Sequence, residues 1–143
     1  MKENDEFLEC AEVFNHNYGT PKKPVENELK QGNCVLFDID WQGARQIKEK
    51  FDKDSVISIF ILPPSMHELE RRLRARAQDP EEVVQNRMKK ARDEISHFNE
   101  YDFILVNDEL QGTYQKIRAI IEAKRVARSK KSEIDRLVQQ FLK

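Results

Sequence analysis

Glycine is scarce in this chain of 143 residues, which holds four glycines, each isolated from the others. They are Gly19, Gly32, Gly43 and Gly112. The pattern G-x-x-x-x-G-K-[ST], whose backbone N–H groups cradle nucleotide phosphates, is therefore absent from these residues. Cysteine is also scarce, since Cys10 and Cys34 are too few for a disulfide-dense fold. We interpret them as two reduced, buried thiols of a cytoplasmic protein.

Long apolar runs are missing too. None approaches the ~20 residues that span a bilayer, and the first residues lack the apolar segment of a signal peptide. The chain carries 25 Lys and Arg against 26 Asp and Glu, so neither sign of charge dominates. We therefore predict neither a membrane nor a nucleic-acid partner. Residues 112–143 hold nine basic and three acidic residues, so a basic nucleic-acid-binding helix is kept as the lowest-ranked alternative.

The apolar residues form periodic blocks that predict strands and helices. Strands are expected at 7–14, 34–39, 55–62 and 103–106, with a turn over 15–19. Helices are expected at 21–31 (stopped by Gly32), 42–50, 65–76 (opened by a Ser65–Glu68 capping box), 79–98, 110–128 (Tyr114 inward) and after Ser132. The unbroken apolar run over 34–37 predicts a strand covered on both faces. This order is typical of an α/β domain with a mainly parallel sheet.

Polar residues at the predicted strand ends locate a candidate site. In parallel α/β sheets, ligands bind beyond the carboxyl ends of the strands, and Asp38, Asp40 and Asn107 lie at such ends. Alternate residues of an extended segment point the same way, so both aspartates are expected to face one cleft. Such a pair suits magnesium, usually through water, or a ligand rich in hydrogen-bond donors. The plainer alternative is that these acids only cap the next helix.

A group of arginines forms a second candidate. Arg71, Arg72, Arg74 and Arg76 lie within one predicted helix, and Arg87 lies on the next. Arg72 and Arg76 are four residues apart and share a face. Arginine suits bidentate phosphate binding and neutralises charge in phosphoryl transfer. From composition alone, however, a solvated basic helix is the better interpretation.

Three polar residues around Gly19 are the last candidates: Glu9, Tyr18 and Thr20. A carboxylate, a phenol and a hydroxyl beside a glycine turn could read a polar ligand. On their own they are ordinary turn and strand residues.

Taken together, these segments resemble guanylate kinases in order and spacing, from about Glu6 to the end of the chain. The segments are FLECAEVF…NYGTP, VLFDIDWQGARQI, SIFILPPSMHELERRLRAR, DPEEVVQNRM and YDFILVND. FDIDWQGA is the most diagnostic. The resemblance implies transfer of a phosphoryl group from ATP, with Mg²⁺, to GMP, giving ADP and GDP.

The resemblance also implies roles for individual residues in GMP binding. The residues that match the family's guanine-reading set are Glu9, Thr20 and Asp40. Tyr18 matches a tyrosine that binds the GMP phosphate. Asp38 matches an acid close to the phosphates and to magnesium-bound water, so no side chain is expected to ligate the metal directly.

Two further sets follow from the same resemblance. Arg72, Arg76 and Arg87 match arginines that close over the phosphates from a lid, and with Asp38 they form the expected catalytic set. Asn107 matches an asparagine near the adenine pocket. Together with Arg72 and Arg76 it forms the expected ATP-binding set.

The implied architecture is a P-loop nucleoside-monophosphate-kinase-like α/β core that lacks its first strand. Residues 1–32 are expected to form a partial GMP-binding lobe, 33–72 core, 73–92 a helical lid, and 93–143 core and C-terminal helices. At the lid turn, Ala75-Arg76-Ala77 replaces the family's Gly-Arg-Gly, which predicts a stiffer hinge. Without the phosphate loop these residues alone are expected to be inactive. Exposed sheet edges predict a homo-oligomer, by edge pairing or by swapping.

A guanylate-kinase-like protein-interaction module without catalysis is the alternative from another class. Such modules tend to lose the nucleotide-contacting residues, whereas those of this chain are of the enzyme type. The sequence therefore favours the kinase.

Overall fold

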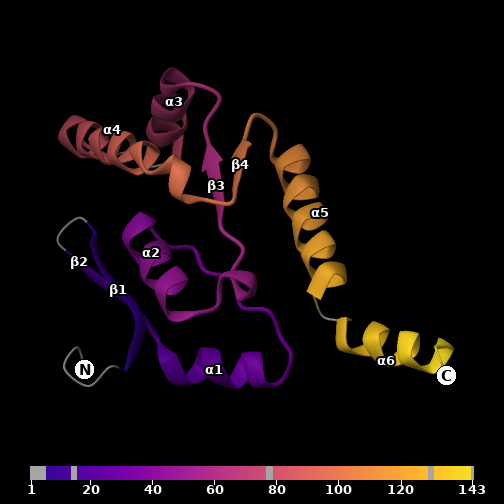
Figure 1. Ribbon diagram of the computed structural model, residues 1–143. Coiled ribbons are helices and arrows are strands. Elements are labelled where there is room, and N and C mark those ends of the chain that lie inside the picture. Colours follow the sequence, from indigo (N-terminus) through magenta and orange to yellow (C-terminus); the bar gives the residue numbers. More distant parts are fainter. Residues whose placement is uncertain (1–5, 14–15, 77–78, 129–130, 143) are drawn as a thin grey trace. The chain divides into compact units, whose positions relative to one another are not determined.

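The computed structural model describes residues 6–13, 16–76, 79–128 and 131–142 (Figure 1). The chain divides into two compact units. The first consists of Met1–Ser58 and Gln85–Phe103, and the second of Ile59–Val84 and Ile104–Lys143. None of the helices formed by the described residues is long and apolar enough to cross a membrane.

The first unit begins with an antiparallel hairpin of β1 (Phe7–Val13) and β2 (His16–Pro21). The predicted turn over 15–19 is wrong, because residues 16–19 belong to β2 and pair with β1. Gly19 lies opposite Cys10, and a Cβ atom there would meet Cδ1 of Phe7 at 2.9 Å. This glycine therefore permits a close approach between the strands rather than a turn.

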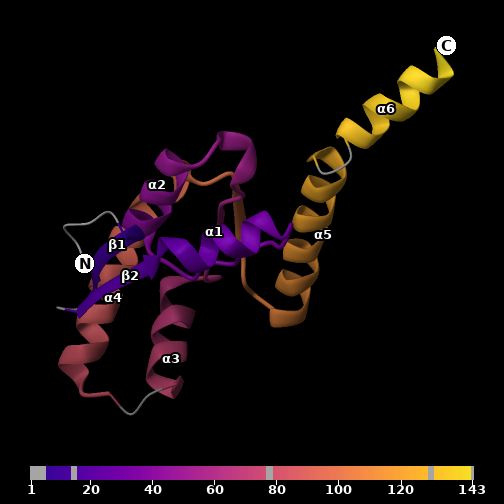
Figure 2. The same cartoon turned by 90° about the horizontal axis from the view of Figure 1, so that it is seen from below.

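Two helices follow the hairpin. Helix α1 (Lys22–Lys30) ends before Gly32, whose φ of 80° lies in the left-handed region, so the predicted glycine stop is confirmed. Helix α2 (Trp41–Lys50) lies beside β1 in both views (Figures 1 and 2). A buried hydrophobic cluster of this unit consists of Leu8 from β1, Val25 from α1 and Ile47 from α2. Val35, Phe37, Ile39, Phe51 and Val56 pack against it.

The segment before α2 differs from its prediction. No strand forms over 34–39, and burial alternates: Val35, Phe37 and Ile39 pack on the core, whereas Leu36 is 88% exposed. A strand needs a neighbour to complete its hydrogen-bond ladder, and no described strand pairs with this segment. The predicted burial on both faces is therefore wrong. Cys34 is likewise exposed, and Cys10 is half-buried, so the expectation of two buried thiols is also wrong.

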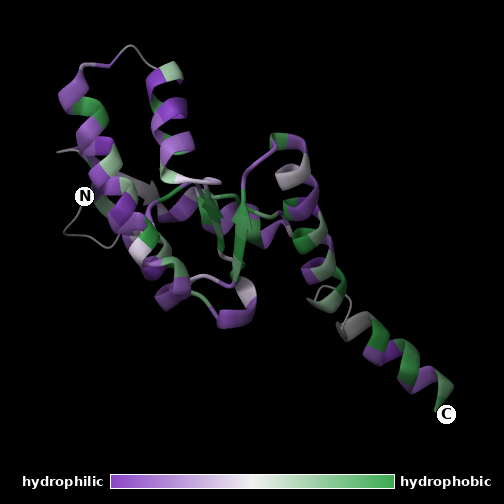
Figure 3. Cartoon of the chain, turned by 90° about the horizontal axis from the view of Figure 1, so that it is seen from above, coloured by the Kyte–Doolittle hydropathy of each residue, from purple (hydrophilic) through white to green (hydrophobic). Residues whose placement is uncertain are grey.

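A second sheet joins β3 (Ile59–Leu62) to β4 (Phe103–Val106). The backbone N–H of Phe103 donates to the carbonyl of Ser58, and that of Asn107 to the carbonyl of Leu62. The partners advance together along both strands, so the pair is parallel. Figure 3 shows these two strands as predominantly apolar. The α/β class and the predicted strands over 55–62 and 103–106 are thereby confirmed. β3 is shorter than predicted, because residue 55 belongs to the 3₁₀ helix η2 (Lys53–Ser55) and residues 56–58 form no strand.

The remaining helices are α3 (Met66–Arg76), α4 (Glu81–Ser96), the 3₁₀ helix η3 (Phe98–Glu100), α5 (Leu110–Arg128) and α6 (Lys131–Phe141). Ser65 Oγ accepts a hydrogen bond from the backbone N–H of Glu68 at 3.0 Å, as a helix N-cap does. Tyr114, predicted to face inward, is 50% exposed, and its neighbour Thr113 is buried instead. Ser132 lies within α6 rather than before it.

A polar cluster fastens α2 to η3 within the first unit. The ring of Trp41 stacks on that of His97 with centroids 3.8 Å apart, and the Arg45 guanidinium lies 4.7 Å from the Trp41 ring. Arg45 Nη2 and His97 Nδ1 both lie within hydrogen-bond distance of Glu100 Oε1, at 2.6 and 2.8 Å. Lys48 donates to the Glu100 carbonyl. Arg45, and secondarily His97, lower the pKa of Glu100 to about 2.

Glu100→Gln is expected to remove a pH-dependent part of the free energy of unfolding. Because the pKa of Glu100 in the fold lies below the ordinary 4.5, its carboxylate stabilises the protein above that pH. This contribution is lost as the pH falls towards 2. Urea denaturation at a series of pH values should therefore show a gap between wild type and variant that closes in acid. Glu12→Gln, which makes the same substitution at an exposed position of β1, is the matched control.

Candidate functional site

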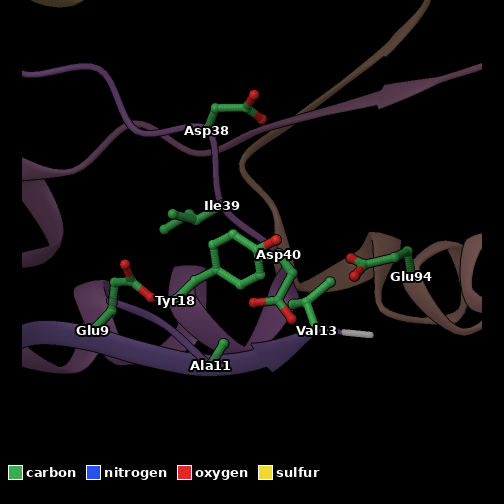
Figure 4. A pocket seen from close by; sticks show the side chains of 8 residues that line it. All are labelled: Glu9, Ala11, Val13, Tyr18, Asp38, Ile39, Asp40 and Glu94. Atoms are coloured by element: carbon green, nitrogen blue, oxygen red, sulfur yellow. The ribbon is translucent and has the colours of Figure 1, made fainter. Parts of the chain in front are cut away.

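A pocket of about 350 Å³ opens in the first unit. It lies between the β1–β2 hairpin, the segment before α2 and the first unit's part of α4 (Figure 4). Its lining is Glu9, Ala11, Val13, Tyr18, Asp38, Ile39, Asp40 and Glu94. Four of these are carboxylates and none is basic, so the pocket favours a ligand that donates hydrogen bonds. Its apolar walls come from Ala11, Val13 and Ile39, which suit a flat, weakly hydrated group.

Glu9 is the most deeply buried of the four acids, at 3% exposed. The cross-strand register places it opposite Thr20, whose hydroxyl donates to Oε1 at 2.6 Å. A Cβ atom on Gly43 of α2 would lie 2.9 Å from Oε2, so this helix approaches the carboxylate closely. A buried carboxylate costs free energy unless it is hydrogen-bonded, and Thr20 supplies one such bond.

Asp40 both caps α2 and lines the pocket. Its Oδ1 accepts from the backbone N–H of Gly43, and its Oδ2 from the side-chain amide of Gln42, each at 3.0 Å. Asp40 therefore caps the helix, as the plainer alternative predicted, and it also borders the cavity. Asp38, two residues earlier, is exposed and also lines it. The two aspartates thus border one pocket.

Tyr18 is 56% exposed on β2. In Figure 4 its ring lies between the side chains of Glu9 and Asp40. A phenol so exposed at the border of an acidic pocket can donate a hydrogen bond to a ligand.

Glu94 is a pocket residue that sequence reasoning missed. Its Oε2 accepts from the backbone N–H of Trp41 at 3.2 Å, across 53 residues of sequence. Burial raises the pKa of Glu94, and the charge of Asp40 raises it further. Burial, with added repulsion from Glu94 and Asp40, raises the pKa of the nearby Tyr101 to about 12. No local motif marks this residue, because its contact forms only when α4 packs near α2.

Two predicted residues of the second unit lie together. Arg72 donates from Nε to Glu68 Oε1 at 2.7 Å, from Nη1 to the Asn107 carbonyl at 2.8 Å and from Nη2 to the Asp108 carbonyl at 3.2 Å. Asn107 Oδ1 in turn accepts from the Thr113 hydroxyl at 3.0 Å. Arg71 and Arg72 together lower the pKa of Glu68 to about 2.

The other predicted arginines lie on α3 and α4. Arg76 ends α3 in the second unit, and Arg87 lies on the first unit's part of α4. Ala77 of the predicted lid turn lies outside the described residues. Over 6–13, 16–76, 79–128 and 131–142, no group of three His, Cys, Asp or Glu residues is arranged to hold a metal ion.

The parallel β3–β4 pair and the helices between its strands are those of a nucleoside-monophosphate-kinase-like α/β fold. A crystal structure of guanylate kinase from Anaplasma phagocytophilum matches it with a TM-score of 0.71 at 40% sequence identity, covering 86% of this chain and 58% of that one. The family model described as guanylate kinase matches residues 1–124. The chain belongs to the guanylate kinase family, as its sequence segments predicted.

Curated relatives agree with this placement. The guanylate kinase of Rhodopseudomonas palustris (strain HaA2) is 51% identical over 141 residues, which are 99% of this chain and 64% of that protein. The guanylate kinase of Mesorhizobium japonicum is 50% identical over 131 residues, or 92% of this chain and 60% of that protein. This chain thus spans somewhat less than two thirds of the length of these relatives.

Two matched glycine variants test the packing of α2 against Glu9. Gly43 and Gly112 are each the third residue of their helix, but a Cβ atom on Gly112 would meet nothing within 4 Å. Gly112→Ala is expected to stabilise the protein by up to about 1 kcal/mol. Gly43→Ala should gain none of this, because its Cβ would displace the Glu9 carboxylate and press on Ile39. Equal gains in urea denaturation would contradict the packing.

Proposed function

We propose that this chain carries the GMP-binding part of a guanylate kinase, which transfers a phosphoryl group from ATP to GMP and yields ADP and GDP. Membership of the family supports the reaction class, and the pocket supports the nucleotide. The acidic, partly apolar cavity also favours a nucleotide ligand over a protein-interaction module without catalysis.

The buried carboxylate of Glu9 is the observation that carries this proposal. Guanine presents N1–H and N2–H as neighbouring donors, and a carboxylate can accept from both. Thr20 occupies Oε1 of Glu9 with one hydrogen bond, and each carboxylate oxygen can accept a further one. Adenine lacks this pair of donors and would leave a buried acceptor unpaired. Sites of this kind reject the wrong base by on the order of 10⁴ in the best cases.

The remaining predicted residues divide between the two substrates. In this proposal Asp40 accepts from guanine, and Tyr18 donates to the GMP phosphate. Asp38 lies at the exposed side of the pocket, where it would meet magnesium-bound water near the phosphates. Mg²⁺ bound with ATP would neutralise charge at the phosphoryl group.

The arginines would act on the transferred phosphoryl group. Phosphoryl transfer depends almost entirely on positioning and on neutralising charge, and Arg72, Arg76 and Arg87 carry the required charge. The side chain of Asn107, next to Arg72 in the second unit, is proposed to lie near adenine. A lid over 73–92, a cytoplasmic location and association of chain copies stay predictions. Association is supported by β3 and β4, which pair only with each other among the described strands.

Glu9→Gln is expected to weaken GMP binding by about 1.5–3 kcal/mol, or roughly ten- to a hundredfold in Kd. The amide turns a donor towards the donors of guanine and loses the charge. Isothermal titration of the 143-residue chain with GMP, and with AMP for comparison, measures the change. Glu12→Gln makes the same substitution at an exposed position of β1 and should bind as wild type does. Equal GMP affinity of wild type and Glu9→Gln would refute the assignment.

The 143 residues alone are expected to show no GMP-dependent formation of ADP. They contain no glycine-rich phosphate loop to hold the γ-phosphate in line with the GMP oxygen. Loss of positioning can forfeit about 7–11 kcal/mol of barrier reduction. A coupled assay with ATP, magnesium and GMP measures turnover, with Arg72→Ala as the control for a contaminating host kinase. Turnover that Arg72→Ala abolishes would show this expectation to be wrong.

A further inference from the structure

The first turn of α2 is held by carboxylates from two different elements. The first N–H groups of a helix have no partner within the helix. Here Asp40, just before the helix, accepts from the N–H of Gly43, and Glu94 of α4 accepts from the N–H of Trp41. The Trp41 N–H belongs to the peptide bond that joins Asp40 to Trp41. The hydrogen bond to Glu94 therefore acts on the backbone directly next to Asp40.

We propose that Glu94 is a positioning residue, which fixes the first turn of α2 through the Trp41 N–H and so holds the Asp40 carboxylate at the pocket. This inference rests on the proposed function, in which Asp40 reads guanine. In Figure 4 the Glu94 side chain points towards Asp40 from the opposite side of the pocket to Glu9. Glu94 therefore reaches the pocket border from a helix that carries no predicted guanine-reading residue.

The electrostatics agree with a positioning contact. Burial, Asp40 and Asp93 all disfavour the charge of Glu94, whereas the Trp41 N–H and Lys90 favour it. A half-buried carboxylate beside a second one costs free energy, which the hydrogen bond to Trp41 offsets in part. If the hydrogen bond rather than the charge positions the turn, Glu94→Gln will preserve that position, because the amide oxygen of glutamine can accept a hydrogen bond from the same N–H.

Asp93 supplies a matched control on the same helix. Its Oδ2 accepts from the indole Nε1 of Trp41 at 3.1 Å, so it touches the side chain of the residue whose backbone Glu94 holds. Asp93 is exposed and does not line the pocket. Its loss should leave the backbone of the turn, and therefore Asp40, in place.

The test compares Glu94→Ala, Glu94→Gln and Asp93→Ala with wild type. In the ligand-free chain, amide hydrogen exchange of Trp41 should become faster in Glu94→Ala and stay slow in the other two. In calorimetric titration with GMP, Glu94→Ala should raise the Kd on the order of tenfold, and Glu94→Gln and Asp93→Ala should stay within about twofold. If Glu94→Ala does not fold, Glu94→Asp, which withdraws the carboxylate by one methylene, takes its place with the same expectations.

Two results would overturn the proposal: a Trp41 amide that exchanges in Glu94→Ala at the wild-type rate, or a wild-type GMP affinity in that variant. Loss of affinity in Glu94→Gln as large as in Glu94→Ala would also overturn it, because charge rather than position would then matter. If wild type itself binds no GMP, the proposed function fails. The exchange rates then test only whether Glu94 holds the Trp41 amide. A positioning role survives only if this amide exchanges slowly in Glu94→Gln and fast in Glu94→Ala.

Discussion

The buried carboxylate of Glu9 is the constraint on which the first unit depends. A charge that is 3% exposed must find hydrogen bonds within the protein, and the register of the hairpin brings Thr20 opposite it for this purpose. The absence of a side chain at Gly43 of α2 leaves room for the same carboxylate, because a Cβ atom there would lie 2.9 Å from its Oε2. Asp40 caps this helix, and hairpin and helix together bring Glu9 and Asp40 to one pocket.

The sequence predicted best those elements whose ends are marked by local sequence signals. The strand over 103–106 and the helix over 110–128 have the predicted bounds, because polar residues flank a short apolar run in one and a long periodic pattern fills the other. The segment 34–39 looked equally apolar but forms no strand, since a strand depends on a neighbour that a local pattern does not reveal. Residues 16–19 have turn composition, yet pairing with β1 extends them.

Some residues of the candidate site could likewise be predicted from the sequence, and one could not. Asp38 and Asp40 were found from their position after an apolar run, and Glu9 and Tyr18 gained weight only from the resemblance to a family. The structure places all four at one pocket. Glu94 could not be found from the sequence, because it lies among ordinary helix residues and its partner is 53 positions away. Residues whose role comes from a long-range backbone contact leave no local signal.

Arg72 ties α3 to the main chain beyond β4 rather than to side chains. Two of its donors bind the carbonyls of Asn107 and Asp108, and a third binds Glu68 one turn away on its own helix. Carbonyl groups of the backbone cannot rotate away as side chains do. The guanidinium therefore links the helix to the β4–α5 connection through hydrogen bonds to fixed acceptors. A displacement of α3 that keeps these hydrogen bonds would carry the β4–α5 connection, and Asn107 with it.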